Sequence, residues 1–135
     1  MKNFLALLTL LFAVSVTFGQ GGAEKWAELK SFHGVMSQTF HPSEKGDYKP
    51  IRSRAGEMLE KAEALQKSTP PAEFNNEKMK MAVANLVASV KAVKNAVDKN
   101  DTDEKIGKLL SASHDAFHQV MEKCEKEDEH EGHKH

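Results

Sequence analysis

The stretch 75–124 reads NNEKMKMAVANLVASVKAVKNAVDKNDTDEKIGKLLSASHDAFHQVMEKC, and the spacing of its apolar residues decides the fold. Core-type residues recur at alternating steps of four and three, the period of one buried helix face. The two series are Met79, Val83, Leu86, Val90, Val93, Val97 and Ile106, Leu110, Ser113, Phe117, Val120, Cys124. This pattern predicts two amphipathic helices, the first capped by Asn75 or Asn76 and the second by Thr102 or Asp103.

Two more helices are predicted upstream by the same spacing. Pro42 is expected to end the first of them, and the second is expected to begin near Pro50 and to stop at 68–71. Their core series are Trp26, Leu29, His33, Met36, Phe40 and Ile51, Ala55, Met58, Ala62, Leu65. Four such helices with short connections predict an all-α fold, an antiparallel up-down-up-down four-helix bundle over 26–124. A three-helix bundle with a loose first segment is the alternative.

The composition limits the classes of function. The chain has 135 residues, a formal net charge of −1, a single Cys and 7% aromatic residues. This length makes one domain, and the near-neutral charge argues against nucleic acid as a partner. The sequence contains no nucleophile elbow, Gly-rich phosphate loop or His-Glu-x-x-His motif, so we expect a protein that is not an enzyme.

The two ends of the chain differ from its centre. Lys2 and the apolar run 4–18 are typical of a secretory signal peptide at 1–19, cleaved near Gly19. We therefore expect a periplasmic or secreted protein, with a short flexible segment at 20–25 and no stable membrane insertion of the mature chain. Residues 125–135 are charged and are expected to form a disordered, acidic, His-rich tail. A monomer or weak dimer is expected.

The distribution of the seven His residues suggests a site. His130, His133 and His135 lie in the tail, where they either bind zinc, copper or nickel weakly or are simply solvated. The other four, at positions 33, 41, 114 and 118, fall on the first and last helices.

The first and last helices are antiparallel neighbours in the predicted bundle. His114 and His118 are one turn apart on one face. His33 should lie near His118, and Met36 or Ser37 near His114. Imidazole and thioether side chains suit iron, copper and zinc. The predicted metal ligands are His33, Met36, His41, His114 and His118.

Two segments carry a resemblance to a known family. The end of the second helix with its turn, 58–71, and the end of the fourth, Asp115-Ala116-Phe117-His118-Gln119, resemble the soluble periplasmic four-helix-bundle cytochromes, the cytochrome b562 and cytochrome c′ superfamily. The resemblance covers roughly 29–123. It implies haem at one end of the bundle and an electron-transfer function with a periplasmic redox partner.

The resemblance also implies haem-binding residues. His118 matches the family's proximal His on the fourth helix. The family's second ligand, a Met, falls at Phe32 when counted without gaps, with His33 one residue on and Met36 one turn on. The second ligand is thus His33 or Met36, or is absent, and Phe32 and Phe117 pack on the macrocycle. The stretch 114–118 lacks both Cys of the Cys-x-x-Cys-His motif, which excludes covalent attachment and leaves non-covalent haem b.

Three functions remain open at this point. The first is a haem b electron-transfer protein. The second is a haem-free zinc- or copper-binding bundle that uses the His cluster of the first and last helices. The third is a bundle without a cofactor that acts as an interaction or stress-related module.

Overall fold

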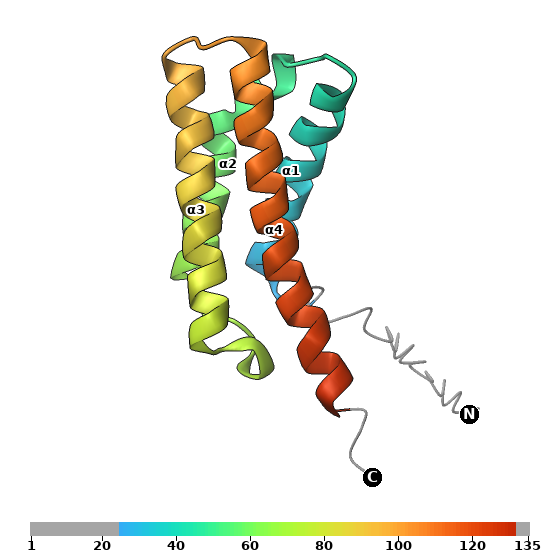
Figure 1. Cartoon of the computed structure of the whole chain (residues 1–135). Coiled ribbons are helices and arrows are strands. Elements are labelled where there is room, and N and C mark those ends of the chain that lie inside the picture. The colour runs from blue at the N-terminus through green and yellow to red at the C-terminus, as the bar shows by residue number, and fades with distance from the viewer. Residues whose placement is uncertain (1–24, 132–135) are drawn as a thin grey trace, which may run out of the picture.

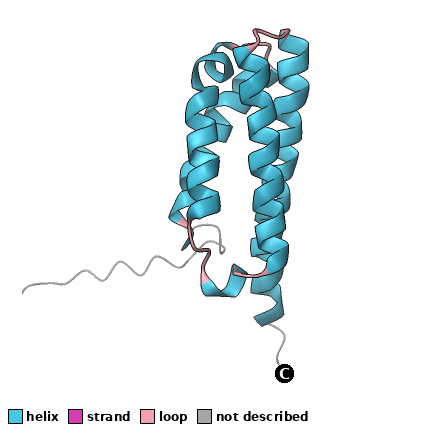
Figure 2. Cartoon of the chain, turned by 90° about the vertical axis from the view of Figure 1, so that its left-hand side faces the viewer, coloured by secondary structure: helices cyan, strands magenta, loops and turns pink. Residues whose placement is uncertain are grey.

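The structure is a computed structural model that describes residues 25–131, with side chains as far as Glu125. Four helices form the predicted bundle: α1 (Ala27–Glu44), α2 (Lys49–Lys67), α3 (Glu77–Asp98) and α4 (Asp103–Glu131) (Figure 1). The short 3₁₀ helix η2 (Ala72–Phe74) packs against α4, and no strand occurs within the described residues (Figure 2). The predicted signal peptide at 1–19 and nearly all of the segment at 20–25 lie outside the described residues.

The helix ends form where the sequence provides capping groups. The backbone N–H of Met79 donates to Asn76 Oδ1 over 2.9 Å, which confirms Asn76 as the N-cap of α3. At the start of α4, Thr102 Oγ1 accepts from the backbone N–H of Lys105 over 3.2 Å. Pro50 lies in the first turn of α2, where the N–H that it lacks would have had no helical partner. These local signals fix three of the helix starts.

The prediction that Pro42 ends α1 is wrong. The helix continues to Glu44 with Pro42 inside its last turn. Proline removes one backbone N–H, whose helical partner would have been the carbonyl of Gln38, and the Pro42 carbonyl still accepts from the backbone N–H of Lys45 over 3.0 Å. Gly46, with φ of +83°, then turns the chain out of the helical path. The additional turn places His41 and Glu44 on the same helix as His33.

The core follows the predicted series on three helices. Every predicted core position of α2 and of α4 is buried, including Ser113 and Cys124. On α3 the series is buried as far as Val93, and Ala96 takes the place predicted for Val97, which is half-buried. η2 adds Phe74, which is fully buried against the bundle.

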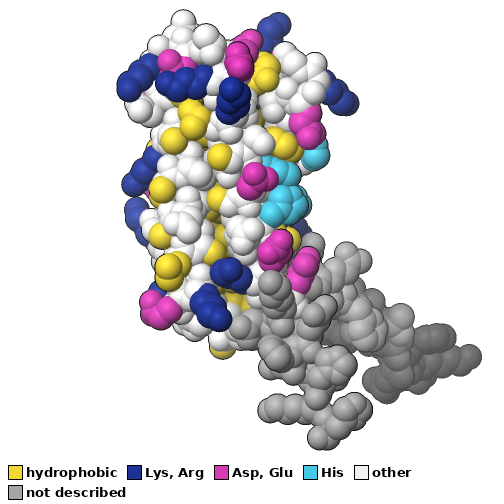
Figure 3. All heavy atoms as spheres, in the orientation of Figure 1, with side chains coloured by type: hydrophobic (Ala, Val, Ile, Leu, Met, Phe, Trp, Pro, Cys, Tyr) yellow, Lys and Arg dark blue, Asp and Glu magenta, His cyan; other side chains and the backbone are white. Residues whose placement is uncertain are grey.

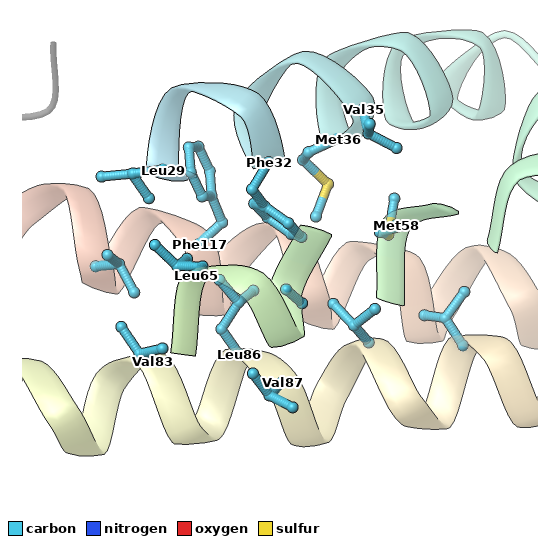
Figure 4. Packing of buried hydrophobic residues seen from close by; sticks show 14 of the residues in the cluster. Leu29, Phe32, Val35, Met36, Met58, Leu65, Val83, Leu86, Val87 and Phe117 are labelled. Carbon is cyan, nitrogen blue, oxygen red and sulfur yellow. The ribbon is translucent and has the colours of Figure 1, made fainter. Parts of the chain in front are cut away.

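The core register of α1 differs from the prediction. His33 is exposed and Phe32 is fully buried, so the prediction of His33 as a core residue is wrong. Phe32 packs with its ring centroid 5.6 Å from that of Phe117, and Met36 points inward beside it (Figure 4). One turn on, Thr39 is buried and Phe40 only partly so. The core position that follows Leu29 is therefore Phe32, three residues on, and not His33, four residues on. The larger apolar side chain of Phe32 takes the interior position.

The C-terminal end of α4 also differs from the prediction. The helix continues past Cys124 to Glu131, into the segment that was expected to be disordered from residue 125. The residues that follow Cys124 are mainly Glu and Lys, which favour helical backbone. Residues 132–135 lie outside the described part. Across the described residues, no helix is long and apolar enough to span a membrane.

Candidate functional site

Aromatic and imidazole rings gather on the outer side of the α1–α4 pair. These two helices approach each other less closely than the other neighbouring helices do, which leaves room for rings between them. Figure 3 shows the His side chains together on one flank of the molecule, beside α4. We refer to this set as the imidazole face; its members are His33, Phe40, His41, His114, Phe117 and His118.

The centre of the imidazole face is the pair on α4. The ring centroids of His114 and His118 are 4.4 Å apart and the rings are nearly perpendicular, at 85°. The spacing of four residues puts both side chains on one side of the helix, one turn apart. His118 is exposed and His114 is half-buried, so solvent reaches the pair.

Phe40 of α1 holds the His114 ring in place. The two rings stack with centroids 3.8 Å apart and an interplanar angle of 10°. One face of the imidazole is covered by the phenyl ring, while its nitrogens lie at the ring edge. His114 was predicted to lie opposite Met36 or Ser37 of α1. It lies opposite Phe40, about one helical turn further along α1.

His33 of α1 contacts the ring of Phe117 on α4. The two rings stack with centroids 5.1 Å apart, and the Phe117 ring is 6.1 Å from that of His118. His33 and His118, which were predicted to lie near each other, thus both lie against Phe117.

His41 and Glu44 extend the imidazole face toward the end of α1. His41 Nδ1 is 3.4 Å from a carboxylate oxygen of Glu44, and both side chains are exposed. Their charges act on His114, so they lie in its neighbourhood. Glu44 was not among the predicted site residues; its spacing of three from His41 becomes informative only once α1 is known to continue past Pro42.

The environment of His114 favours its neutral form. Burial lowers the pKa of His114 below its ordinary value, and the charges of His118 and His41 act in the same direction. Asp115 and Glu44 oppose this shift without cancelling it. A neutral imidazole keeps a lone pair available for a metal ion or for a hydrogen-bond donor.

Acidification is expected to weaken the fold through His114. Because the pKa of His114 is lower in the folded chain, the unfolded chain takes up this proton first as the pH falls below about 6.5. The unfolded state then binds more protons, so the free energy of unfolding decreases from pH 7 toward pH 5. Urea denaturation should show a smaller decrease for His114→Gln than for the unmodified chain. Equal decreases would contradict the assignment.

Two of the residues predicted to hold haem, Met36 and His118, lie on different sides of the bundle wall. Met36 is 1% exposed and points into the core, where it lies among Phe32 and other apolar side chains (Figure 4). His118 is exposed on the outside of the bundle. Phe32 and Phe117 pack against each other, which fills the interior that a macrocycle would need. The residues present therefore do not fit a haem bound between His118 and Met36.

The part of the chain with described side chains holds no preformed metal cage. Among residues 25–125, no three His, Cys, Asp or Glu side chains are arranged so that they could hold a metal ion together. The five predicted metal ligands thus divide into four: the adjacent pair His114 and His118, the exposed His41 beside Phe40, His33 stacked on Phe117, and Met36 in the core.

Comparisons of the chain with protein-family models, curated proteins and solved structures find no match. The resemblance to the bundle cytochromes therefore stays a prediction.

Proposed function

We propose that the protein binds a divalent transition-metal ion, zinc or copper, on the imidazole face, with His114 and His118 as the anchoring ligands. The observation that carries this proposal is the adjacency of the two rings, 4.4 Å apart and accessible from solvent. Two His residues four apart on a helix are a recurrent metal-binding arrangement, because both imidazoles reach one point above the helix surface.

The electrostatics of the pair support the same proposal. A metal ion competes with protons for imidazole nitrogen, so a ligand whose pKa is lowered gives up less affinity near neutral pH. Burial lowers the pKa of His114, and its stack on Phe40 restricts the orientation of the ring. A restricted ligand loses less conformational entropy when the metal binds.

Two exposed side chains can complete the coordination. His41 offers a third imidazole and Glu44 a carboxylate, and both lie near His114. Exposed side chains change rotamer within nanoseconds, so their present separation from the pair does not prevent coordination. Zinc accepts a mixture of imidazole and carboxylate ligands, and copper favours imidazole. The predicted signal peptide at 1–19 would bring this site to the periplasm or the exterior.

A titration with Zn²⁺ and Cu²⁺ tests the proposal. The full mature chain should carry His130→Ala, His133→Ala and His135→Ala, because those tail residues offer weak competing sites. Isothermal calorimetry is expected to show one ion per chain, with Cu²⁺ bound more tightly than Zn²⁺. The melting temperature should rise with either ion, because a ligand of the native state stabilises it. No saturable binding in this background would contradict the proposal.

A further inference from the structure

A shallow groove runs between α3 and α4, away from the imidazole face. Its volume is about 380 Å³, and its lining comes from one side of each helix: Lys78, Met81, Ala82, Asn85, Ala116, Gln119 and Lys123. Figure 3 looks onto this side of the molecule and shows apolar side chains exposed along the seam between the two helices. The groove takes no part in the proposed metal site.

The middle of the groove is uncharged, and three of its side chains are apolar. Met81 is 66% exposed, and within the described residues no other large hydrophobic side chain is exposed. Ala82 and Ala116 have small side chains, so the surface is hollow between the helices. An exposed methionine beside such a hollow provides a flexible apolar wall that adapts to what lies against it.

The charge of the groove is confined to one end. Because α3 and α4 run antiparallel, Lys78 near the start of α3 is level with Lys123 near the end of α4. Asn85 and Ala116 lie level with each other about 10 Å further along, at 1.5 Å per residue. No acidic side chain contributes to the lining. The groove therefore combines a cationic end with an uncharged length of roughly two helical turns, where Met81, Ala82 and Ala116 lie beside the amides of Asn85 and Gln119.

We propose that this groove binds the anion of a medium-chain fatty acid, one molecule per chain. The carboxylate would lie between the ammonium groups of Lys78 and Lys123, and the alkyl chain would follow Ala82 and Ala116 beneath Met81. The lysines complement the charge of the carboxylate, and the apolar side chains of the groove complement the alkyl chain. An alkyl chain of about ten carbons spans the length that the groove offers.

The dimensions argue against larger occupants. An amphipathic helix is about 10 Å in diameter and needs a broader trough than a groove of this volume. An anionic membrane is typically recognised by four to eight clustered Lys and Arg residues, whereas this groove has its two lysines at one end. A single amphiphile matches both the width and the position of the charge.

Titration with sodium decanoate below its micellar concentration tests the proposal on the full mature chain. Calorimetry is expected to give saturable binding of one decanoate per chain. The double variant Lys78→Gln/Lys123→Gln should bind about tenfold more weakly, since each exposed ion pair contributes modestly. Ala116→Leu fills the groove and should abolish binding. Lys49→Gln, an exposed lysine on α2, is the matched control and should bind as the unmodified chain does.

The results of these titrations distinguish a bound fatty acid from other occupants of the groove. Circular dichroism first confirms that each variant is folded. Equal binding of decyltrimethylammonium, which carries the opposite charge, would contradict the role of the lysines. Binding that is insensitive to Ala116→Leu would overturn the assigned place. Retention of the protein by anionic phosphatidylglycerol vesicles without binding of monomeric decanoate would show a membrane-docking surface and overturn the proposal.

Discussion

Phe32→Ala is expected to lower the free energy of unfolding by about 3–5 kcal/mol, and His33→Ala, at the next position, by about 0.5 kcal/mol or less. Phe32 is fully buried and packs on Phe117, so its truncation leaves a cavity in the centre of the bundle. His33 is exposed, and its substitution removes only a ring contact at the surface. The two neighbouring substitutions thus form a matched pair.

Urea denaturation followed by circular dichroism measures both values. The comparison is direct because both variants remove an aromatic ring from the same turn of α1 and introduce the same alanine. If His33→Ala were the more destabilising change, the buried side of α1 would be the one predicted from the alternating spacing. The structure would then have the helix rotated by one residue.

The second large effect concerns the anchoring pair of the proposed metal site. In the background without tail His residues, His114→Ala and His118→Ala are each expected to weaken Zn²⁺ and Cu²⁺ binding by at least about 100-fold. Two ligands on one rigid helix act as a chelate, and the loss of either one removes the gain from their high effective concentration. His41→Ala should have a smaller effect, since Glu44 offers an alternative third ligand.

His33→Ala is the matched control for this experiment. It removes an exposed imidazole from the imidazole face, but the ring on which His33 stacks is Phe117 and not one of the α4 pair. Calorimetry should therefore give the same metal affinity for His33→Ala as for the parent background. If His33→Ala weakened binding as much as His118→Ala, the ligand set would bridge α1 and α4 across Phe117. The assignment made here would then be wrong.

Much of the bundle could be predicted because its signals are local. The core series of α2 and α4, the Asn76 cap and the Thr102 start each depend on residues within a few positions of one another. The end of α1 could not be predicted, because a proline in the last turn removes only one backbone hydrogen bond. A proline therefore indicates that a helix tends to end nearby, but it does not fix the last residue of the helix.

In the candidate site, the contacts within one helix could be predicted from the sequence and the contacts between helices could not. The i, i+4 spacing of His114 and His118 was sufficient to place them on one face of a helix. Their neighbours on the other helix were not predicted: Phe40 of α1 stacks on His114, and His33 of α1 stacks on Phe117, next to His118. Which residue of α1 lies opposite a given residue of α4 depends on the rotation and the height of both helices, and periodicity fixes neither with the precision of a single residue.

The sequence by itself determined the four helices, the N-terminal caps of α3 and α4 and most of the buried faces, because backbone hydrogen bonding and apolar spacing act over a turn or two. Only the tertiary structure decided that Phe32 and not His33 enters the core, since this depends on which ring packs on Phe117. That choice placed His33 in solvent and left Met36 in the interior, away from the exposed His118. The packing of one helix against another thus separated the ligands predicted for haem and left the His114–His118 pair together, because those two share a helix.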